Sequence, residues 1–249
     1  MKSFIAVDLE TTGLSPEQNH IIEIGALKYV DGTCVEKFSK LVKPPVSIPD
    51  RITEITGIDD EMVTNADPID VVWHAFEQFV DQEEVLLGHN LKFVYAFLKA
   101  AAKRQKRTFN KKGLDTLLLA RKLLPELPKK NLTMVSAHYG VTNPRAHRAY
   151  EDAQTTAEVY FAMLREFGNS NADLFVPKEM QVKVKKEEPI TQRQKNYLID
   201  LLKYHKIQGE VFFKEKGTTI DELTKSQASK MIDGIILQYG RIKRIFSTH

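Results

Sequence analysis

Two acidic residues, Asp8 and Glu10, interrupt an apolar run near the start of the chain. The preceding run, Phe-Ile-Ala-Val at 4–7, has the composition of a β-strand, on which residues two apart project to the same face. Two unpaired buried carboxylates would be costly, so the pair indicates either a solvent-facing strand end or a metal site. Hydrolysis of a phosphodiester with two divalent cations requires carboxylates that converge on ions about 4 Å apart. Asp8 and Glu10 suit part of such a site.

A second candidate segment lies much further along the chain, where His147 precedes Asp152 by five residues at the start of a predicted helix. A histidine with an ordinary pKa of about 6.5 is suited to accept a proton from water at neutral pH. Asp152 could complete a metal ligand set. Taken alone, however, the segment is more simply interpreted as an exposed histidine and an acid favoured at a helix N-terminus.

Together these segments resemble the DEDDh family of ribonuclease-H-like 3′→5′ exonucleases, which includes the proofreading epsilon subunit of bacterial DNA polymerase III. The resemblance covers about residues 3–166. The first family motif is similar to VDLETTGLSP at 7–16, and the third is similar to HRAYEDAQTTAEV at 147–159. Connecting segments such as IIEIGALKY and LDTLLLARKLLPEL follow in the family's order. Several motifs in the correct order are far more specific than an isolated Asp-x-Glu.

The resemblance implies an activity and a set of site residues. By its motifs, Asp8, Glu10 and Asp152 would bind Mg²⁺ or Mn²⁺, and His147 would be the catalytic base. The residues expected to hold the terminal nucleotide, or to line the cleft beside it, are Thr11, Thr12, Gly13, Leu14, His89 and Asn90. For His89 and Asn90, holding the loop by hydrogen bonds is an equally good interpretation.

The second motif departs from the family pattern, which is His-Asn, two variable residues and then Phe-Asp. This chain reads His89-Asn90-Leu91-Lys92-Phe93-Val94, so Val94 stands where the metal-binding Asp belongs. A valine cannot ligate a metal, and the second ion of the family's pair is therefore expected to bind weakly. Asp115 is the nearest motif-associated carboxylate, but we do not expect it to replace the missing ligand.

The expected function is a metal-dependent 3′→5′ exonuclease, acting on DNA in preference to RNA and releasing nucleoside monophosphates by two-metal hydrolysis that Val94 impairs. The alternative is a catalytically weak or inactive exonuclease fold that binds nucleic-acid 3′ ends or a polymerase. The candidate partners are single-stranded DNA or nucleic-acid 3′ ends, and a DNA polymerase subunit. A third interpretation is that Val94 is an introduced change.

The elements that must position these residues follow from hydrophobic periodicity. Apolar runs predict strands at 4–7, 21–30, 34–42 and 84–90, and helical spacing returns in five later segments, at 68–81, 91–105, 113–125, 131–141 and 150–167. Strands followed by helices imply an α/β fold, here a ribonuclease-H-like mixed sheet flanked by helices. The predicted boundaries are an exonuclease domain at 1–168, a linker at 169–189 and a small basic helix–extended–helix domain at 190–249. Capping boxes at Thr191 and Thr224 mark the two helices of that domain.

Composition limits the class of protein but does not identify it. The 249 residues carry a net charge of +3, yet residues 181–249 hold 14 Lys or Arg against 8 Asp or Glu, so the basic excess lies in the C-terminal region. Its basic residues, among them Lys195, Lys225, Lys243 and Arg244, could contact phosphates or simply form a charged surface. Cys34 is the only cysteine, which excludes an internal disulfide, and no apolar run approaches a membrane span. We therefore expect a soluble, cytoplasmic protein without a membrane partner.

Overall fold

The structure is a computed structural model that describes residues 2–80, 85–182 and 188–242. The chain divides into two compact units, within residues 1–184 and 185–249. Each unit has its own apolar core, and each is described by itself below.

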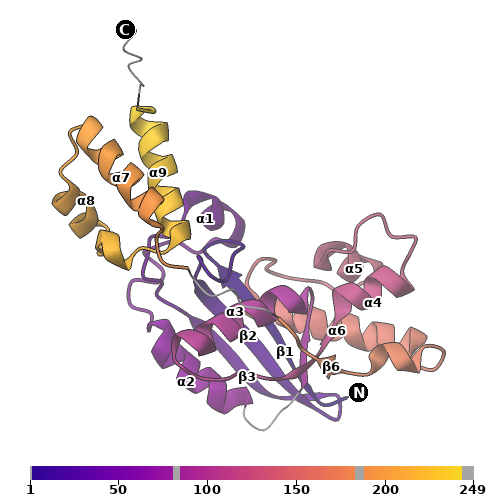
Figure 1. Ribbon diagram of the computed structural model, residues 1–249. Coiled ribbons are helices and arrows are strands. Elements are labelled where there is room, and N and C mark those ends of the chain that lie inside the picture. Colours follow the sequence, from indigo (N-terminus) through magenta and orange to yellow (C-terminus); the bar gives the residue numbers. More distant parts are fainter. Residues whose placement is uncertain (1, 81–84, 183–187, 243–249) are drawn as a thin grey trace. The chain divides into compact units, whose positions relative to one another are not determined.

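The first unit is built on a six-stranded sheet in the order β3-β2-β1-β4-β5-β6 (Figure 1). Strands β1, β2 and β3 are antiparallel neighbours, β4 and β5 run parallel to β1, and β6 is antiparallel to β5. Because β1, β4 and β5 are parallel, their carboxyl ends meet at one edge of the sheet. The strands are β1 (Phe4–Thr11), β2 (Ile21–Val30), β3 (Thr33–Leu41), β4 (Val85–Gly88), β5 (Lys112–Asp115) and β6 (Lys178–Glu179).

Helices cover both faces of this sheet, which confirms the mixed α/β architecture that the sequence predicts. Helices α2 and α3 pack on one face, and α4, α5 and α6 pack on the other. The irregular connection after β3 contains the short helix α1. The helices are α1 (Asp50–Thr56), α2 (Ile69–Val80), α3 (Leu91–Arg104), α4 (Thr116–Leu123), α5 (Leu132–His138) and α6 (Ala149–Phe167).

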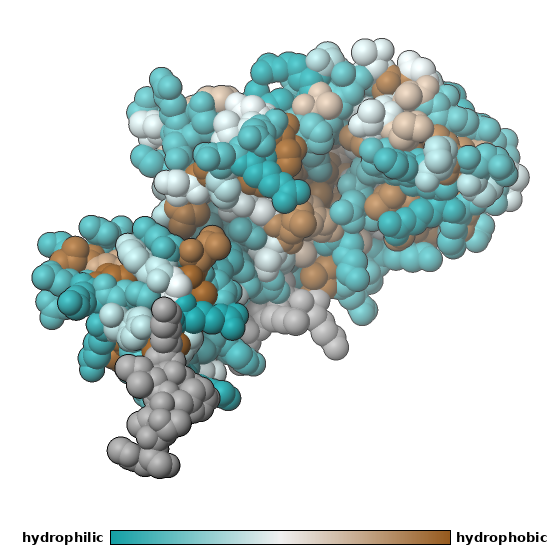
Figure 2. All heavy atoms as spheres, turned by 90° about the horizontal axis from the view of Figure 1, so that it is seen from above, coloured by the Kyte–Doolittle hydropathy of each residue, from teal (hydrophilic) through white to brown (hydrophobic). Residues whose placement is uncertain are grey.

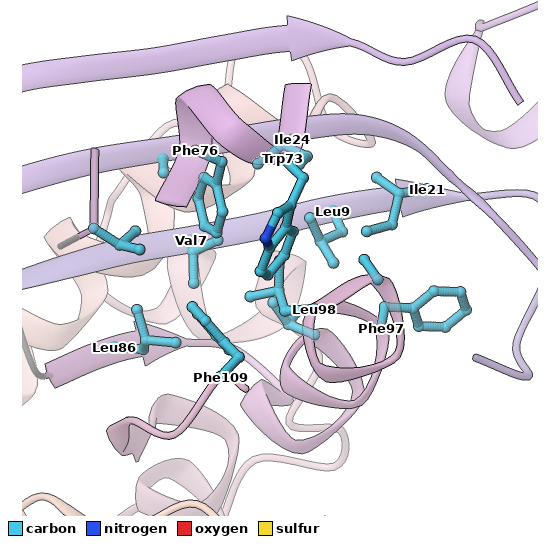
Figure 3. Packing of buried hydrophobic residues seen from close by; sticks show 14 of the residues in the cluster. Val7, Leu9, Ile21, Ile24, Trp73, Phe76, Leu86, Phe97, Leu98 and Phe109 are labelled. Atoms are coloured by element: carbon cyan, nitrogen blue, oxygen red, sulfur yellow. The ribbon is translucent and has the colours of Figure 1, made fainter. Parts of the chain in front are cut away.

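Strand β1 is buried on both faces, and its alternation decides where the acidic residues point. Val7 and Leu9 belong to the cluster that contains Trp73 and Phe76 of α2 (Figure 3). Phe4 and Ala6 belong to the opposite cluster, with side chains of α6. Since successive strand residues project to opposite faces, Asp8 and Glu10 lie on the face that α6 covers.

A glycine allows α6 to approach this face closely. Gly25 of β2 pairs with Asp8 of β1, and a Cβ atom at Gly25 would lie 2.1 Å from the backbone carbon of Ala149. Real Cβ atoms do not approach backbone this closely, so only glycine fits. The first turn of α6 therefore lies against the sheet next to Asp8.

Part of the segment at 169–189, expected as a linker, packs on the first unit. Residues Ala172–Phe175 form a 3₁₀ helix whose Phe175 is buried with α6, and β6 extends the sheet edge. Met180 and Val182 pack against the α2 and α3 cluster. These apolar residues are spaced without regular periodicity among polar ones, so pattern analysis does not detect them.

The second unit is a small helical bundle of α7 (Gln192–Tyr204), α8 (Gly209–Glu215) and α9 (Lys225–Tyr239). Both predicted capping boxes are confirmed, at Thr191 and at Thr224. The extended segment that we expected between the two helices is wrong, because α8 occupies it. Its consecutive residues Val211, Phe212 and Phe213 resemble a strand in composition, yet the two phenylalanines pack as part of a helix against the core of this unit. Lys243 and Arg244 lie outside the described residues.

The surface carries mostly hydrophilic side chains in the view of Figure 2, with hydrophobic residues in small groups. Within the residues that the structure describes, no helix combines the length and apolarity needed to cross a membrane.

Candidate functional site

The fold brings three of the predicted site residues together. One ligand atom from each of Glu10, His147 and Asp152 lies within 4.8 Å of the others. Asp8 is not one of these three residues, but it lies on the same face of β1 as Glu10. In addition to burial, the charges of Glu10 and Asp152 raise the pKa of Asp8. Residues from the two ends of the first unit's sequence thus form one acidic cluster, which we call the carboxylate cluster: Asp8, Glu10 and Asp152.

The electrostatics of the carboxylate cluster disfavour ionisation. Burial raises the pKa of Asp8 well above its usual range, and the charges of Glu10 and Asp152 raise it further. Burial, followed by repulsion from Asp152 and Glu23, raises the pKa of Glu10 to about 8. Burial also raises the pKa of Asp152. Like charges held at close range need either protons or a cation to neutralise them.

Two hydrogen bonds from the preceding loop hold Asp152 in place. The Asn143 side-chain amide donates to one carboxylate oxygen over 2.5 Å, and the backbone N–H of His147 donates to the other over 3.0 Å. His147 itself has a positive φ of 65°, a left-handed conformation that is uncommon for residues other than glycine. This turn exposes the His147 side chain beside Asp152 immediately before α6 begins.

A buried ion pair fixes α6 to the sheet behind the carboxylate cluster. Glu23, only 1% exposed, stands opposite Glu10 on β2 and accepts three hydrogen bonds from Arg148, the shortest of them 2.6 Å. The backbone N–H of Ala149 donates to the same carboxylate over 2.9 Å. The Arg148 charge also opposes the rise in the pKa of Glu10. The ion pair therefore anchors α6 to the sheet, and its Arg148 charge partly offsets the repulsion that Glu10 experiences from Asp152 and Glu23.

Val94, which stands where the family's second motif has a metal-binding Asp, takes no part in the carboxylate cluster. Val94, in α3, is 1% exposed and belongs to the apolar cluster that includes Val7 and Leu9. Asp115 is used by the fold: one of its oxygens caps α4 through Leu117 N–H at 2.9 Å and receives Asn90 N–H at 3.0 Å. These bonds favour our expectation that Asp115 does not replace the missing ligand.

His89 is held on both sides of its ring. Its Nε2–H donates to the carbonyl of Lys130 over 2.8 Å, and its Nδ1 forms a hydrogen bond of 2.9 Å with the Thr116 hydroxyl, which also lies 3.2 Å from the carbonyl of Gly88. Burial lowers the pKa of His89, which favours the neutral ring. Asn90, with a φ of 64°, is exposed beside it. These hydrogen bonds are the contacts that the loop-holding interpretation of His89 requires.

The residues after β1 form a tight turn. The Thr11 hydroxyl donates to the carbonyl of Gly13 over 2.7 Å, and the Thr12 hydroxyl accepts from the backbone N–H of His20 over 2.9 Å. A Cβ atom at Gly13 would lie 2.7 Å from the side chain of Asn19, so a larger residue there would have to displace that side chain. Leu14 is 85% exposed at its tip.

Sequence analysis missed three residues that shape this site. Glu23 had a signal, since a lone acid within the apolar run IIEIGAL needs a partner if it is buried. Asn143 also had one, the Asn-Pro turn at 143–144. Gly25 could not be assigned a role, because its contact with α6 depends on tertiary packing.

The carboxylate cluster fits a divalent cation. Mg²⁺ and Mn²⁺ prefer hard oxygen ligands, and carboxylates with raised pKa values gain most from a neighbouring positive charge. Glu10 and Asp152, with Asp8 beside them, would hold the cation.

Comparison with known proteins identifies the class of the first unit. Residues 5–160 match the RNase_T family model, described as Exonuclease. The chain belongs to this exonuclease family, whose members generally use divalent metals, and it therefore contains a nuclease domain of the hydrolase class.

Its relatives include replication proteins. The chain is 42% identical over 156 residues to the PolC-type DNA polymerase III of Clostridium perfringens, matching 63% of this chain but 11% of that protein. It is 34% identical to the DNA polymerase III subunit epsilon of Aquifex aeolicus, matching 66% of this chain and 81% of the relative. The resemblance to DEDDh exonucleases of the epsilon type is thus confirmed.

Solved structures agree with the fold. Exonuclease X in complex with 5′ overhanging duplex DNA superposes with a TM-score of 0.56 at 26% identity, covering 66% of this chain and 93% of that one. The nuclease domain of the DEDDh family member 3′hExo, bound to rAMP, gives a TM-score of 0.60 at 19% identity, covering 72% and 98%. The ribonuclease-H-like fold is therefore confirmed.

Proposed function

We propose that this chain is a metal-dependent 3′→5′ exonuclease that removes nucleoside monophosphates from DNA, with a rate limited by Val94. The observation that carries the proposal is the convergence of Glu10, His147 and Asp152 within 4.8 Å at the edge of the sheet. The polymerase III relatives favour DNA over RNA and a polymerase as partner.

Each residue has a distinct part in this mechanism. Asp8, Glu10 and Asp152 hold the divalent cation, which when bound supplies Lewis-acid stabilisation of the charge that develops on the phosphate. His147, exposed beside Asp152, accepts a proton from the attacking water. Arg148 and Glu23 fix the helix that carries Asp152. Thr11, Thr12, Gly13 and Leu14 form the turn next to Glu10 against which the terminal nucleotide binds.

Val94 removes a ligand from the second cation of the family's pair. A valine offers no ligand atom, and the side chain is buried among apolar neighbours. Metal-ion charge near the leaving oxygen should therefore be reduced, which slows hydrolysis while leaving strand binding intact. This observation also favours the second candidate function, a domain that binds 3′ ends without cleaving them.

The test is hydrolysis of single-stranded DNA in Mg²⁺ or Mn²⁺. With a 5′ label, a 3′→5′ exonuclease gives progressively shorter labelled strands; with a 3′ label, it releases the labelled mononucleotide at once. Asp152→Asn is the matched inactive control, and an RNA strand of the same sequence measures the preference for DNA.

The outcomes separate the two candidate functions. Slow shortening from the 3′ end that Asp152→Asn abolishes supports the exonuclease. Tight binding of 3′ ends with no hydrolysis in either metal supports the binding domain, and release of nucleotides from the 5′ end would contradict both.

A further inference from the structure

A polar pocket lies at the same edge of the sheet as the carboxylate cluster. It has a volume of about 440 Å³ and is formed where β4 ends, by α4, by the connection to α5 and by the start of α5. We call it the α4–α5 pocket. Its polar lining residues are His89, Asn90, Arg121, Lys129, Lys130 and Asn131.

The charge of the α4–α5 pocket is positive. Three of its lining residues are basic and none is acidic. Arg121 and Lys129 are exposed, and neither forms an ion pair within the described parts of the chain. Lys130 donates to the carbonyls of Pro125 and Leu127, so its charge is held at the wall. Arg121 and Lys129 are the groups available to bind an anion.

The walls of the pocket are already fixed. The His89 ring joins the end of β4 to α4 through Thr116 and to the α5 side through the carbonyl of Lys130. The side-chain oxygen of Asn131 accepts from Met134 N–H at 3.3 Å and caps α5. A ligand therefore meets a largely preformed site, which reduces the entropy cost of binding.

The position of the pocket follows from strand order. Ala6 of β1 pairs with Leu87 of β4, and Leu87 pairs with Leu114 of β5. Adjacent strands lie about 4.8 Å apart, so β1 and β5 lie roughly 10 Å apart across the sheet. Asp115 at the end of β5 is level with Val7, and Glu10 lies about 10 Å further along β1, so Glu10 is roughly 14 Å from the end of β5. At the duplex spacing of about 3.4 Å per nucleotide this separation corresponds to about four nucleotides, and to fewer in an extended single strand.

We propose that the α4–α5 pocket binds an internal phosphate of the substrate strand, a few nucleotides before its 3′ end, through Arg121 and Lys129. This inference rests on the proposed function, because it takes the 3′ end to lie at the carboxylate cluster. Arg121 presents a planar fork that can bind a phosphate through two hydrogen bonds, and Lys129 adds a point charge. Such contacts position the strand without reading its sequence.

The test compares short and long strands with the full chain. Binding of oligothymidylates of about two and about eight nucleotides is measured by fluorescence anisotropy in EDTA, which stops metal-dependent hydrolysis. In Arg121→Gln/Lys129→Gln, affinity for the long strand should fall about tenfold at low salt, and affinity for the short strand should not change. The slope of log K against log salt should become shallower by about 0.7, the value for one phosphate on a single strand that is no longer neutralised.

A matched control is available on the same unit. Lys122→Gln/Arg165→Gln removes the same charge from α4 and from the far end of α6, outside the pocket lining. It should leave both the length dependence and the salt slope nearly unchanged.

Three results would overturn the assignment. If affinity falls equally in the pocket variant and in the control variant, the loss is caused by the change in net charge and not by the pocket. Weaker binding of thymidine monophosphate in the pocket variant would show that the pocket binds a free nucleotide and not an internal phosphate. If the unaltered chain binds no strand of either length in EDTA, the pocket assignment fails; if it also hydrolyses no strand in Mg²⁺ or Mn²⁺, the proposed exonuclease function fails with it.

Discussion

His147 is the residue whose role can be isolated most cleanly. Its side chain is exposed, and its contact with Asp152 is made by the backbone N–H, so the side chain contributes little to packing. We expect His147→Ala to lower hydrolysis by about 10²–10⁴-fold, as general-base removal does, with little change in melting temperature. His138→Ala, at another exposed histidine, is the control. Unchanged turnover in His147→Ala would remove this residue from the mechanism.

The raised pKa of Glu10 predicts how metal-free stability depends on pH. The folded value is about 8 against an ordinary value of 4.5, so between these values the folded chain retains a proton that the unfolded chain has released. The free energy of unfolding should therefore fall as pH rises from about 5 to about 8, and Glu10→Gln should flatten this fall. Chemical unfolding in EDTA at several pH values measures it.

Metal binding should reverse the trend. A cation at the carboxylate cluster requires ionised carboxylates, so the stabilisation by Mn²⁺ should be larger at pH 8 than at pH 6. An equal stabilisation at both pH values would place the cation elsewhere.

At the scale of elements, Gly25 controls how closely α6 approaches the sheet. Gly25→Ala would place a Cβ atom 2.1 Å from the Ala149 backbone, so α6 must move or the strand must bend. We expect the free energy of unfolding to fall by about 1–3 kcal/mol or more, together with weaker Mn²⁺ binding because Asp152 moves with its helix. Gly234→Ala has nothing within 4 Å of the new atom and should be neutral or slightly stabilising. Equal melting of the two variants would contradict this role for Gly25.

Elements with clear periodicity were predictable from sequence, and those made by tertiary contact were not. The apolar run before Asp8 and the helical spacing after Ala149 specify β1 and α6 directly. Strand β6 is two residues long and has no local pattern of its own, because its pairing with β5 stabilises it. Helix α8 was missed because Val211, Phe212 and Phe213 have strand-like composition, and packing in the second unit decides between the two conformations.

The candidate site divides in the same way. Asp8, Glu10, His147 and Asp152 were predicted because two motifs that contain them resemble those of the exonuclease family, and neither motif alone was sufficient. Glu23 and Asn143 hold that arrangement through contacts between segments that lie far apart or in a turn, and spacing alone does not indicate such contacts.

At the scale of the whole molecule, the second unit provides exposed positive charge. Lys195 pairs with Asp221 and Lys225 pairs with Glu188, so these two cations are partly neutralised. Lys203, Lys206, Lys230 and Arg241 are exposed and form no ion pair among the described residues. We propose that this second set gives salt-sensitive, sequence-independent affinity for nucleic acid.

A chain ending at residue 182 tests this proposal. It should retain the hydrolysis rate at saturating substrate but bind single-stranded DNA more weakly, with a salt slope shallower by about 0.7 for each phosphate that the second unit neutralises. Circular dichroism checks that the shortened chain is folded. An unchanged affinity and slope would indicate that the second unit packs or binds protein instead.

The proposal that Val94 limits the rate is tested most directly by single-turnover hydrolysis of labelled single-stranded DNA in Mn²⁺, comparing the chain with Val94→Asp. Val94→Asn is the control, because asparagine has the same shape as aspartate but lacks its charge. Thermal melts with and without Mn²⁺ verify that each variant is folded. Restoring the ligand should raise the rate about a hundredfold or more, because metal-ion charge stabilisation is worth several kcal/mol, and Val94→Asn should raise it far less. A folded Val94→Asp variant that hydrolyses DNA no faster than the unaltered chain would contradict the proposal.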